Sequence, residues 1–236
     1  MYETIDIYLS LRNRIINHEF EPGQKLNQRM IAEQYGVSNT PVIKALHRLT
    51  SEGLVDNIVN RGFVVHSTNL KELVDLYELR EALEVTAVAD LATLSREETQ
   101  QIAEEIDALM REGGTGNTEK YRQADIALHN IILNRCSNEM LRNINEAHQI
   151  LNRTYLPGLL RDTKETWEEH RAIAEAIRNR DQEAAREAMR KHISITKQSI
   201  ASLVRKLTAL GLNPRNILVD DLVNKELNTE GILDKG

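Results

Sequence analysis

The chain has 236 residues, of which 41% are apolar and 28% charged, with a formal net charge of −6, and this is the composition of an ordinary globular protein. Its single cysteine, Cys136, excludes an internal disulfide and an all-cysteine metal site and suits a reducing compartment. Because residues 1–20 lack the apolar core of a signal peptide and no stretch approaches the roughly 20 uncharged residues of a membrane helix, we expect a cytoplasmic protein.

The negative charge lies in the second part of the chain. Residues 1–68 hold seven Lys or Arg and seven Asp or Glu, whereas residues 69–236 hold 23 and 29. The acidity therefore does not exclude nucleic-acid binding by the neutral first part, because a small basic face can bind DNA weakly as a single copy.

The first 68 residues predict three helices and a β-hairpin. Apolar residues at helical spacing favour a first helix, and they are Ile5, Leu9, Leu11, Ile15 and Ile16. The three helices are expected over 4–18, 28–35 and 39–53, and two short strands are expected within 54–66. Three helices followed by a two-stranded wing form a winged helix-turn-helix, whose third helix enters the DNA major groove.

Capping residues set the limits of these elements. Asn27 and Ser38 are suited to cap the second and third helices, and Gly36 is suited to end the second. Pro41 is tolerated in the first turn of the third helix, since its missing N–H has no helical partner there. Gly62 is free to adopt the positive φ of a tight turn between the two strands.

Long amphipathic helices with short breaks make up the rest of the chain and predict an antiparallel all-α bundle. Ser95 with Glu98 forms a capping box, and Asp181 is suited to cap the last helix. The helices are expected near 69–92, 95–112, 117–135, 138–157, 163–180 and 182–207. We therefore predict a mainly α fold with a winged helix-turn-helix domain over 1–68, a helical domain over 69–207 and a tail of unknown role over 208–236.

Several polar residues of the first domain are suited to DNA contacts. Short polar side chains begin the third helix, two basic residues follow one turn apart, and Arg61 at the wing tip could enter the minor groove. These candidates are Ser38, Asn39, Thr40, Lys44, Arg48 and Arg61. The alternatives are a winged helix that docks proteins and basic residues that merely solvate a surface.

The same region resembles the DNA-binding domain of GntR-family bacterial transcription regulators. The matching positions are Pro22-Gly23, Leu26, Val37-Ser38, Thr40-Pro41-Val42, Ala45-Leu46, Leu49, Gly53-Leu54 and Arg61-Gly62. The resemblance implies DNA contacts by Arg29, Ser38, Thr40 and Arg61. The family usually has arginine at the positions of Asn39 and Ile43, and asparagine can pair bidentately with adenine where arginine prefers guanine.

Three histidines and an aspartate lie on apolar helix faces in the second part. Asp125 and His129 are one turn apart on one predicted helix, while His170 and His192 lie on two others. If these helices share a core, the four side chains converge into a ligand set typical of a divalent transition metal. The alternative for each histidine is a core residue that is hydrogen-bonded to a neighbour.

Residues 69–205 resemble the all-helical FCD effector-binding domain of the FadR subfamily, in its short six-helix form. The resemblance implies a metal held by Asp125, His129, His170 and His192, with zinc first and nickel, manganese or iron also suited. It also implies a homodimer and a small carboxylate effector near Arg80 and Asn138. From the residues alone, Arg80 could instead pair with Glu84 on a solvated face, and Asn138 could cap a helix.

Together these features predict a DNA-binding transcription regulator, expected to be a repressor, that binds a palindromic operator and is not an enzyme. A small carboxylate metabolite bound beside the metal would control its operator affinity. Three alternatives remain: the ion itself is the signal, the ion is purely structural, or the site is a mononuclear metal-dependent hydrolase.

Overall fold

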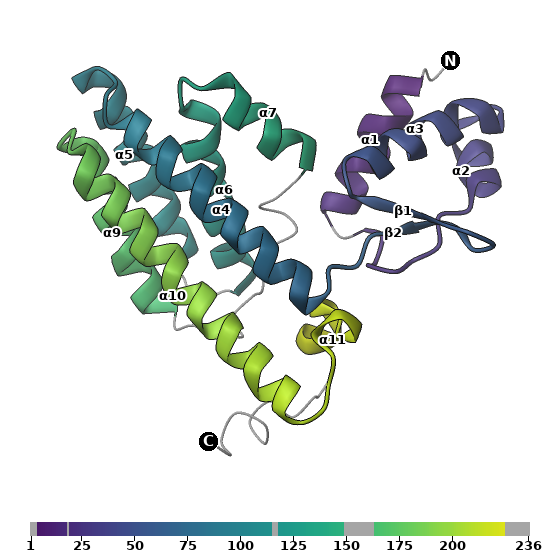
Figure 1. Ribbon diagram of the computed structural model, residues 1–236. Coiled ribbons are helices and arrows are strands. Elements are labelled where there is room, and N and C mark those ends of the chain that lie inside the picture. Colours follow the sequence, from purple (N-terminus) through teal and green to yellow (C-terminus); the bar gives the residue numbers. More distant parts are fainter. Residues whose placement is uncertain (1–3, 18, 115–117, 149–162, 225–236) are drawn as a thin grey trace. The chain divides into compact units, whose positions relative to one another are not determined.

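The computed structural model describes residues 4–17, 19–114, 118–148 and 163–224. It is mostly helical, with one two-stranded sheet among the described residues. The chain forms two compact units, one over residues 1–67 and one that begins at Thr68 (Figure 1). Among the described helices, none is both long enough and apolar enough to span a membrane.

The first unit contains three helices and a hairpin in the predicted order. The helices are α1 (Thr4–Ile16), α2 (Gln28–Tyr35) and α3 (Asn39–Ser51), and the strands are β1 (Val55–Ile58) and β2 (Gly62–Val65). The strands pair antiparallel, with Val55 opposite Val65 and Ile58 opposite Gly62. Helices α1 and α2 both pack on α3, which confirms the winged helix-turn-helix.

Most predicted caps of this unit are present. The Asn27 side chain accepts hydrogen bonds from the backbone of Arg29 and Met30, and Gly36 ends α2 with a left-handed φ of 65°. Gly62 has a φ of 83°, as its place after the turn requires. Ser38 takes the capping position of α3, but its side chain makes no capping hydrogen bond.

The core of the first unit shows which face of α1 is buried. Its buried residues are Ile7, Tyr8, Leu11 and Ile15, whereas Ile5 and Leu9 are 43% and 47% exposed. The apolar spacing alone predicts the helix but leaves the buried face open, because apolar residues lie on both sides. The face that packs on α3 is the one that continues through Leu11 and Ile15.

The second unit is a helical bundle. Its described helices are α4 (Leu70–Leu91), α5 (Arg96–Gly113), α6 (Thr118–Arg135), α7 (Glu139–His148), α9 (Thr163–Arg178) and α10 (Gln182–Ala209). Helix α4 packs along α10 and α6, while α9 packs on α5 and α10. The Ser95–Glu98 capping box and the Asp181 cap are both present. The predicted continuation of α7 to residue 157 lies outside the described residues.

A short C-terminal segment packs on the bundle. A 3₁₀ turn, η1 (Pro214–Asn216), and a helix, α11 (Val219–Asn224), follow α10. The backbone N–H of Leu70 donates to the carbonyl of Ile217 and that of Val219 donates to the carbonyl of Thr68, both at 2.9 Å. Val219 and Leu222 are buried in the core of the bundle, so residues 214–222 cover the N-terminal end of α4.

Candidate metal centre and nucleic-acid interface

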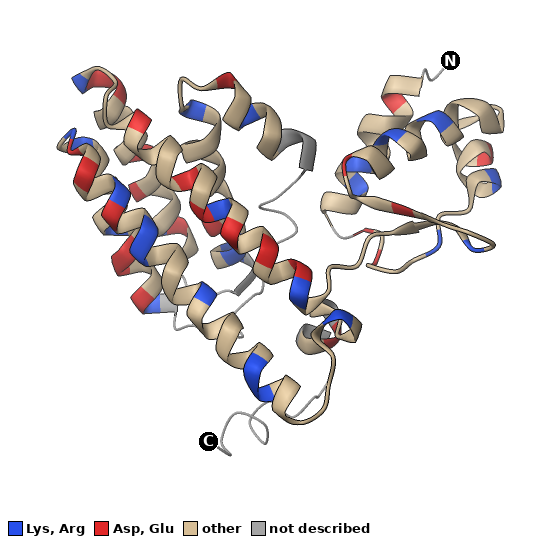
Figure 2. Cartoon of the chain, viewed as in Figure 1, with Lys and Arg blue, Asp and Glu red and all other residues tan. Residues whose placement is uncertain are grey.

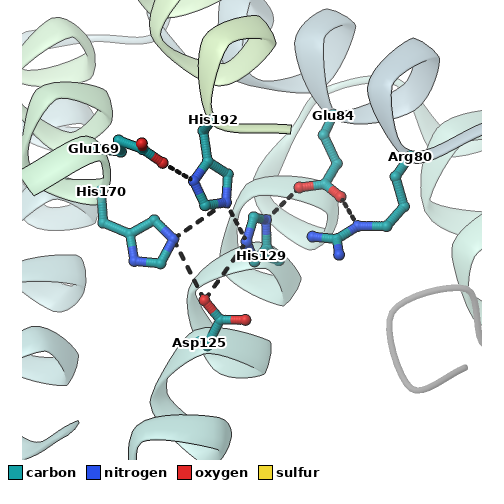
Figure 3. Close-up of polar contacts among 7 residues, drawn as sticks. All are labelled: Arg80, Glu84, Asp125, His129, Glu169, His170 and His192. Atoms are coloured by element: carbon teal, nitrogen blue, oxygen red, sulfur yellow. Dashed lines mark hydrogen bonds and ion pairs between the residues drawn. The ribbon is translucent and has the colours of Figure 1, made fainter. Parts of the chain in front are cut away.

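Three bundle helices each direct one histidine to the same point. His129 on α6, His170 on α9 and His192 on α10 are 1%, 0% and 5% exposed (Figure 3). Asp125 precedes His129 by one turn of α6, and its side chain is 17% exposed. The structure therefore brings together the four side chains that the sequence analysis grouped, and Asp125 is the one most open to solvent.

The Nε2 atoms of the three imidazoles face one another. The Nε2 atom of His192 is 3.3 Å from that of His129 and 3.4 Å from that of His170. The Oδ1 atom of Asp125 is 3.4 Å from His170 Nε2 and 4.0 Å from His129 Nε2. Ligand atoms about 2.1 Å from one ion stand roughly 3.0–3.4 Å apart, so three of these four distances fit a shared transition metal, while the distance between Asp125 and His129 is longer.

Two further carboxylates contact the outer nitrogens of this cluster. Glu84 on α4 hydrogen-bonds His129 Nδ1, and Glu169 on α9 lies 2.8 Å from His192 Nδ1. The other oxygen of Glu84 accepts a hydrogen bond of 2.7 Å from Arg80 Nε. These roles of Glu84 and Glu169 were not predicted from the sequence.

Burial and charge act in opposite directions on these groups. Burial alone would raise the pKa of Glu84, but Arg80 and His129 outweigh it and lower that pKa to about 2. Burial likewise opposes the charge of Arg80, yet Glu84 raises the pKa of Arg80 above its usual value. Burial lowers the pKa of His192, although its hydrogen bond to Glu169 acts in the opposite direction. A lowered pKa favours the neutral imidazole, which is the form that ligates metals.

The two residues predicted to bind an effector have different surroundings. Arg80 pairs with Glu84 as the alternative interpretation proposed, but the pair is buried instead of lying on a solvated face. The Arg80 guanidinium also lies 5.0 Å from the centre of the Tyr77 ring. Asn138 is exposed, and its side chain accepts hydrogen bonds from the backbone of Met140 and Leu141 at the start of α7, as a cap does.

Glu84 lies on a largely buried part of α4. Most of the circumference of α4 is buried, including Leu83, Val85, Ala87 and Val88. Glu84 is fully buried on this helix, and a buried carboxylate needs a partner, which Arg80 and His129 provide. Figure 2 shows acidic and basic residues along α4 and α10, as on the solvated faces of an ordinary bundle.

The predicted DNA contacts are exposed on the first unit. Helix α3 carries two basic residues and no acidic one, and its start is formed by short polar side chains. Arg29 lies on α2 and Arg61 lies in the turn between the strands. The exposed candidates are Arg29, Ser38, Asn39, Thr40, Lys44, Arg48 and Arg61.

Three of the arginines also have contacts within the unit. The guanidinium of Arg48 lies 3.8 Å from the centre of the Tyr8 ring and its Nε is 3.6 Å from Glu52. Arg61 donates to the carbonyl of Gly23 at 3.2 Å. Arg29 pairs with Glu33 on the surface, where such a pair contributes little to stability. These contacts hold the side chains in place at an exposed surface.

Comparison with known families agrees with both units. Residues 4–65 match the family model described as bacterial regulatory proteins, gntR family, and residues 75–194 match the FCD domain. The second match alone covers half of the chain. The two matched regions fall within the winged helix-turn-helix unit and the helical bundle respectively.

Known proteins similar to this chain are transcription regulators. An HTH-type transcriptional regulator in an unstable DNA locus of Streptomyces ambofaciens is 31% identical over 80% of this chain and 80% of its own. The Escherichia coli repressor GlaR is 26% identical over 80% of this chain and 92% of its own. Among solved structures, a GntR regulator from Rhodococcus sp. RHA1 aligns with a TM-score of 0.68 at 22% identity, over 84% of this chain and 97% of its own.

A second solved structure, McbR/YncC of Escherichia coli, has a TM-score of 0.66 at 22% identity and covers 86% of this chain and 99% of its own. These two likenesses support the fold, and the family matches support DNA binding and regulation instead of catalysis. The chain therefore belongs to the GntR family of bacterial DNA-binding transcription regulators, in the group whose helical unit is an FCD domain.

Proposed function

We propose that this regulator is a repressor whose operator affinity is controlled by a small carboxylate metabolite bound beside a divalent metal in the bundle. The observation that carries the proposal is the convergence of three buried imidazoles and one carboxylate. Similar proteins are named as repressors, among them GlaR and the galactonate operon repressor of Escherichia coli. Their names support repression as the direction of control.

The metal ligands in this proposal are Asp125, His129, His170 and His192. Imidazole and carboxylate ligands suit zinc first, and also nickel, manganese and iron. The ion would supply a positive charge next to Asp125, the most exposed of the four side chains. A carboxylate can be attracted to that charge, with Arg80 as a further cation nearby on α4.

The burial of the three histidines favours a resident ion over an ion that acts as the signal. All three are at most 5% exposed and come from separate helices, so an ion bound by them would be largely shielded from solvent. The alternative of a metal-responsive regulator would need an ion that exchanges on the timescale of the response.

For the DNA-binding unit we propose that α3 enters the major groove and the hairpin lies over the minor groove. Ser38, Asn39 and Thr40 would contact bases and adjacent phosphates. The basic contacts would come from Arg29, Lys44, Arg48 and Arg61. A homodimer would present two such units to a palindromic operator, because two-fold symmetry in the protein matches two-fold symmetry in the site.

The experiment is a gel-shift titration of the metal-loaded protein on its operator with a panel of small mono-, di- and hydroxycarboxylates. We expect one class of acid to change operator affinity by at least fivefold, and the Arg80→Met variant to respond less. The matched control is Arg171→Met, which removes an exposed arginine paired with Glu168 on α9. If no acid changes the operator affinity of the metal-loaded protein, the proposal of control by a carboxylate is wrong. That result would not contradict the proposal that the protein binds DNA.

A further inference from the structure

Two carboxylates outside the proposed ligand set contact the outer nitrogens of two histidines. Glu84 reaches His129 Nδ1 from α4, and Glu169 reaches His192 Nδ1 from α9 at 2.8 Å. Both carboxylates are buried or nearly so, with side chains 0% and 13% exposed. Each therefore gives up hydration to contact an imidazole, and this cost indicates a specific interaction.

A neutral imidazole has one N–H and one lone pair, and its two nitrogens exchange these roles between tautomers. A carboxylate beside Nδ1 accepts a hydrogen bond from the Nδ1–H tautomer and so leaves the lone pair on Nε2. In both histidines the nitrogen opposite the carboxylate is the one that faces the cluster centre (Figure 3). The two carboxylates therefore select the tautomer that can ligate an ion at that point.

We propose that Glu84 and Glu169 are positioning residues for the metal centre, which hold His129 and His192 with Nε2 presented to the ion. The inference depends on the proposed function, because it requires that these histidines ligate a metal. Arg80 orients Glu84 in turn, since each oxygen of Glu84 has its own partner. Glu169 is adjacent to His170 in α9. Of these two consecutive residues, His170 is a proposed ligand and Glu169 orients another proposed ligand, His192.

The charges around the centre agree with a divalent ion. Asp125, Glu84 and Glu169 are three carboxylates, and Arg80 is the cation paired with one of them. With neutral histidines this group has a formal net charge of −2, which one divalent cation balances.

The test measures zinc affinity and imidazole tautomers in the full chain. We expect Glu84→Gln and Glu169→Gln each to weaken zinc binding about 10- to 100-fold, the usual effect of losing such an outer partner. Matched controls are Glu81→Gln on α4, whose partner is Lys197, and Glu168→Gln on α9, which is exposed. Both controls should bind zinc within twofold of the unchanged protein.

A readout specific to positioning is the ¹⁵N spectrum of histidine-labelled, zinc-loaded protein. His192 should be protonated at Nδ1 in the unchanged protein and in Glu168→Gln, and this signal should shift or exchange in Glu169→Gln. Because Glu84→Gln leaves Arg80 without its buried partner, circular dichroism must show that this variant is folded; otherwise Glu169→Gln, whose carboxylate is more exposed, decides the test.

The outcomes separate the two proposals. If the unchanged protein binds zinc, Asp125→Ala loses it and both glutamine variants bind like their controls, the positioning role is wrong and the metal centre stands. If the unchanged protein does not bind zinc, cobalt or nickel at all, both proposals are wrong. Weakened binding in Glu169→Gln with an altered His192 signal supports both.

Discussion

Asn39 is the residue on which we expect the operator sequence to depend most directly. It begins α3 and is exposed, at the end of the helix that faces base edges in a winged helix-turn-helix. Its side-chain amide can donate a hydrogen bond to N7 of adenine and accept one from the N6 amino group in the major groove. An arginine here would pair with guanine. Ile43, one turn further along α3, offers an apolar surface that suits the methyl group of thymine.

We expect the Asn39→Arg substitution to change one base pair of each half-site from A·T to G·C. The variant should prefer G·C over A·T at that position by about 1–3 kcal/mol, because a bidentate contact with guanine replaces one with adenine. Selection of binding sites from a randomised operator measures it. Lys44→Ala is the control: loss of a phosphate contact should weaken binding to all sequences alike and lower the salt dependence by about one ion. An unchanged preference in Asn39→Arg would show that Asn39 does not contact a base.

At the residue scale the sequence indicated the four clustered side chains better than it indicated the partners of those side chains. Asp125, His129, His170 and His192 stand out because each is polar on an apolar helix face. Glu84 does not, because an arginine four residues before a glutamate is also the pattern of a solvated surface pair. Its contact with His129 joins residues 45 positions apart, and no local pattern encodes that distance.

The elements of the bundle were predictable where capping residues and breaks mark their ends. The Ser95–Glu98 box and Asp181 each begin a helix within a residue of the predicted position. The C-terminal segment was not predictable, because its apolar residues have no helical stripe of useful length. Its place depends on contacts with α4, about 150 residues earlier in the chain, through Thr68 and Leu70.

The C-terminal segment should contribute to the stability of the bundle. Leu222 is 5% exposed within the core, so we expect Leu222→Ala to lower the free energy of unfolding of the second unit by about 2–3 kcal/mol. Leu212→Ala is the control, since Leu212 is 45% exposed and should change it by less than about 0.5 kcal/mol. Chemical denaturation followed by circular dichroism measures both. Equal stability of the two variants would mean that residues 214–222 do not pack on the bundle in solution.

The end of α5 approaches α6 and α9 closely at Gly113. A Cβ atom there would lie 2.7 Å from the Trp167 ring and 2.8 Å from the Cβ of Ala124. Both distances are shorter than non-bonded carbon atoms normally allow, so the neighbouring atoms would have to shift. Ala124 cannot shift unless its helix moves as well. Trp167 in turn packs edge-on against His170, with ring centres 5.1 Å apart. The glycine therefore lets α5 lie next to the helix that carries a proposed ligand.

We expect Gly113→Ala to reduce the free energy of unfolding by about 1–2 kcal/mol. Alanine alone would favour the helix by up to about 1 kcal/mol, and overpacking costs about 1–3 kcal/mol. Zinc affinity should fall as well, because the Trp167 ring must move against His170. Trp167 is the sole tryptophan, so its fluorescence follows both changes. Glu112→Ala, at an exposed neighbouring position, is the control; a stabilised Gly113→Ala variant would contradict the close packing.

At the scale of the whole molecule, two units of different character share one chain. The first is formally neutral and presents basic residues on α2, α3 and the hairpin, while the rest of the chain is acidic. We expect a single unit with so few basic residues to bind DNA weakly, and we therefore propose that a dimer provides useful operator affinity. This is the physical reason for proposing two-fold symmetry in both the protein and the operator.

A dimer makes the spacing between half-sites a sharp test. Insertion of about 5 base pairs at the operator centre turns one half-site to the opposite face of the duplex. We expect such an insertion to reduce affinity at least 100-fold, whereas changes to bases outside both half-sites should have little effect. Fluorescence anisotropy with labelled duplexes measures both. If the insertion leaves the affinity unchanged, each protein molecule binds its half-site independently, and the proposal that a dimer binds both half-sites is wrong.

The measurement that tests the central claim most directly is the metal content of the protein purified without added metal. With Asp125, His129, His170 and His192 around one point, we expect one divalent transition metal per chain by mass spectrometry, and close to none in His170→Ala. A metal-free protein that also fails to take up added zinc, or a His170→Ala variant that retains a full equivalent, would contradict the account.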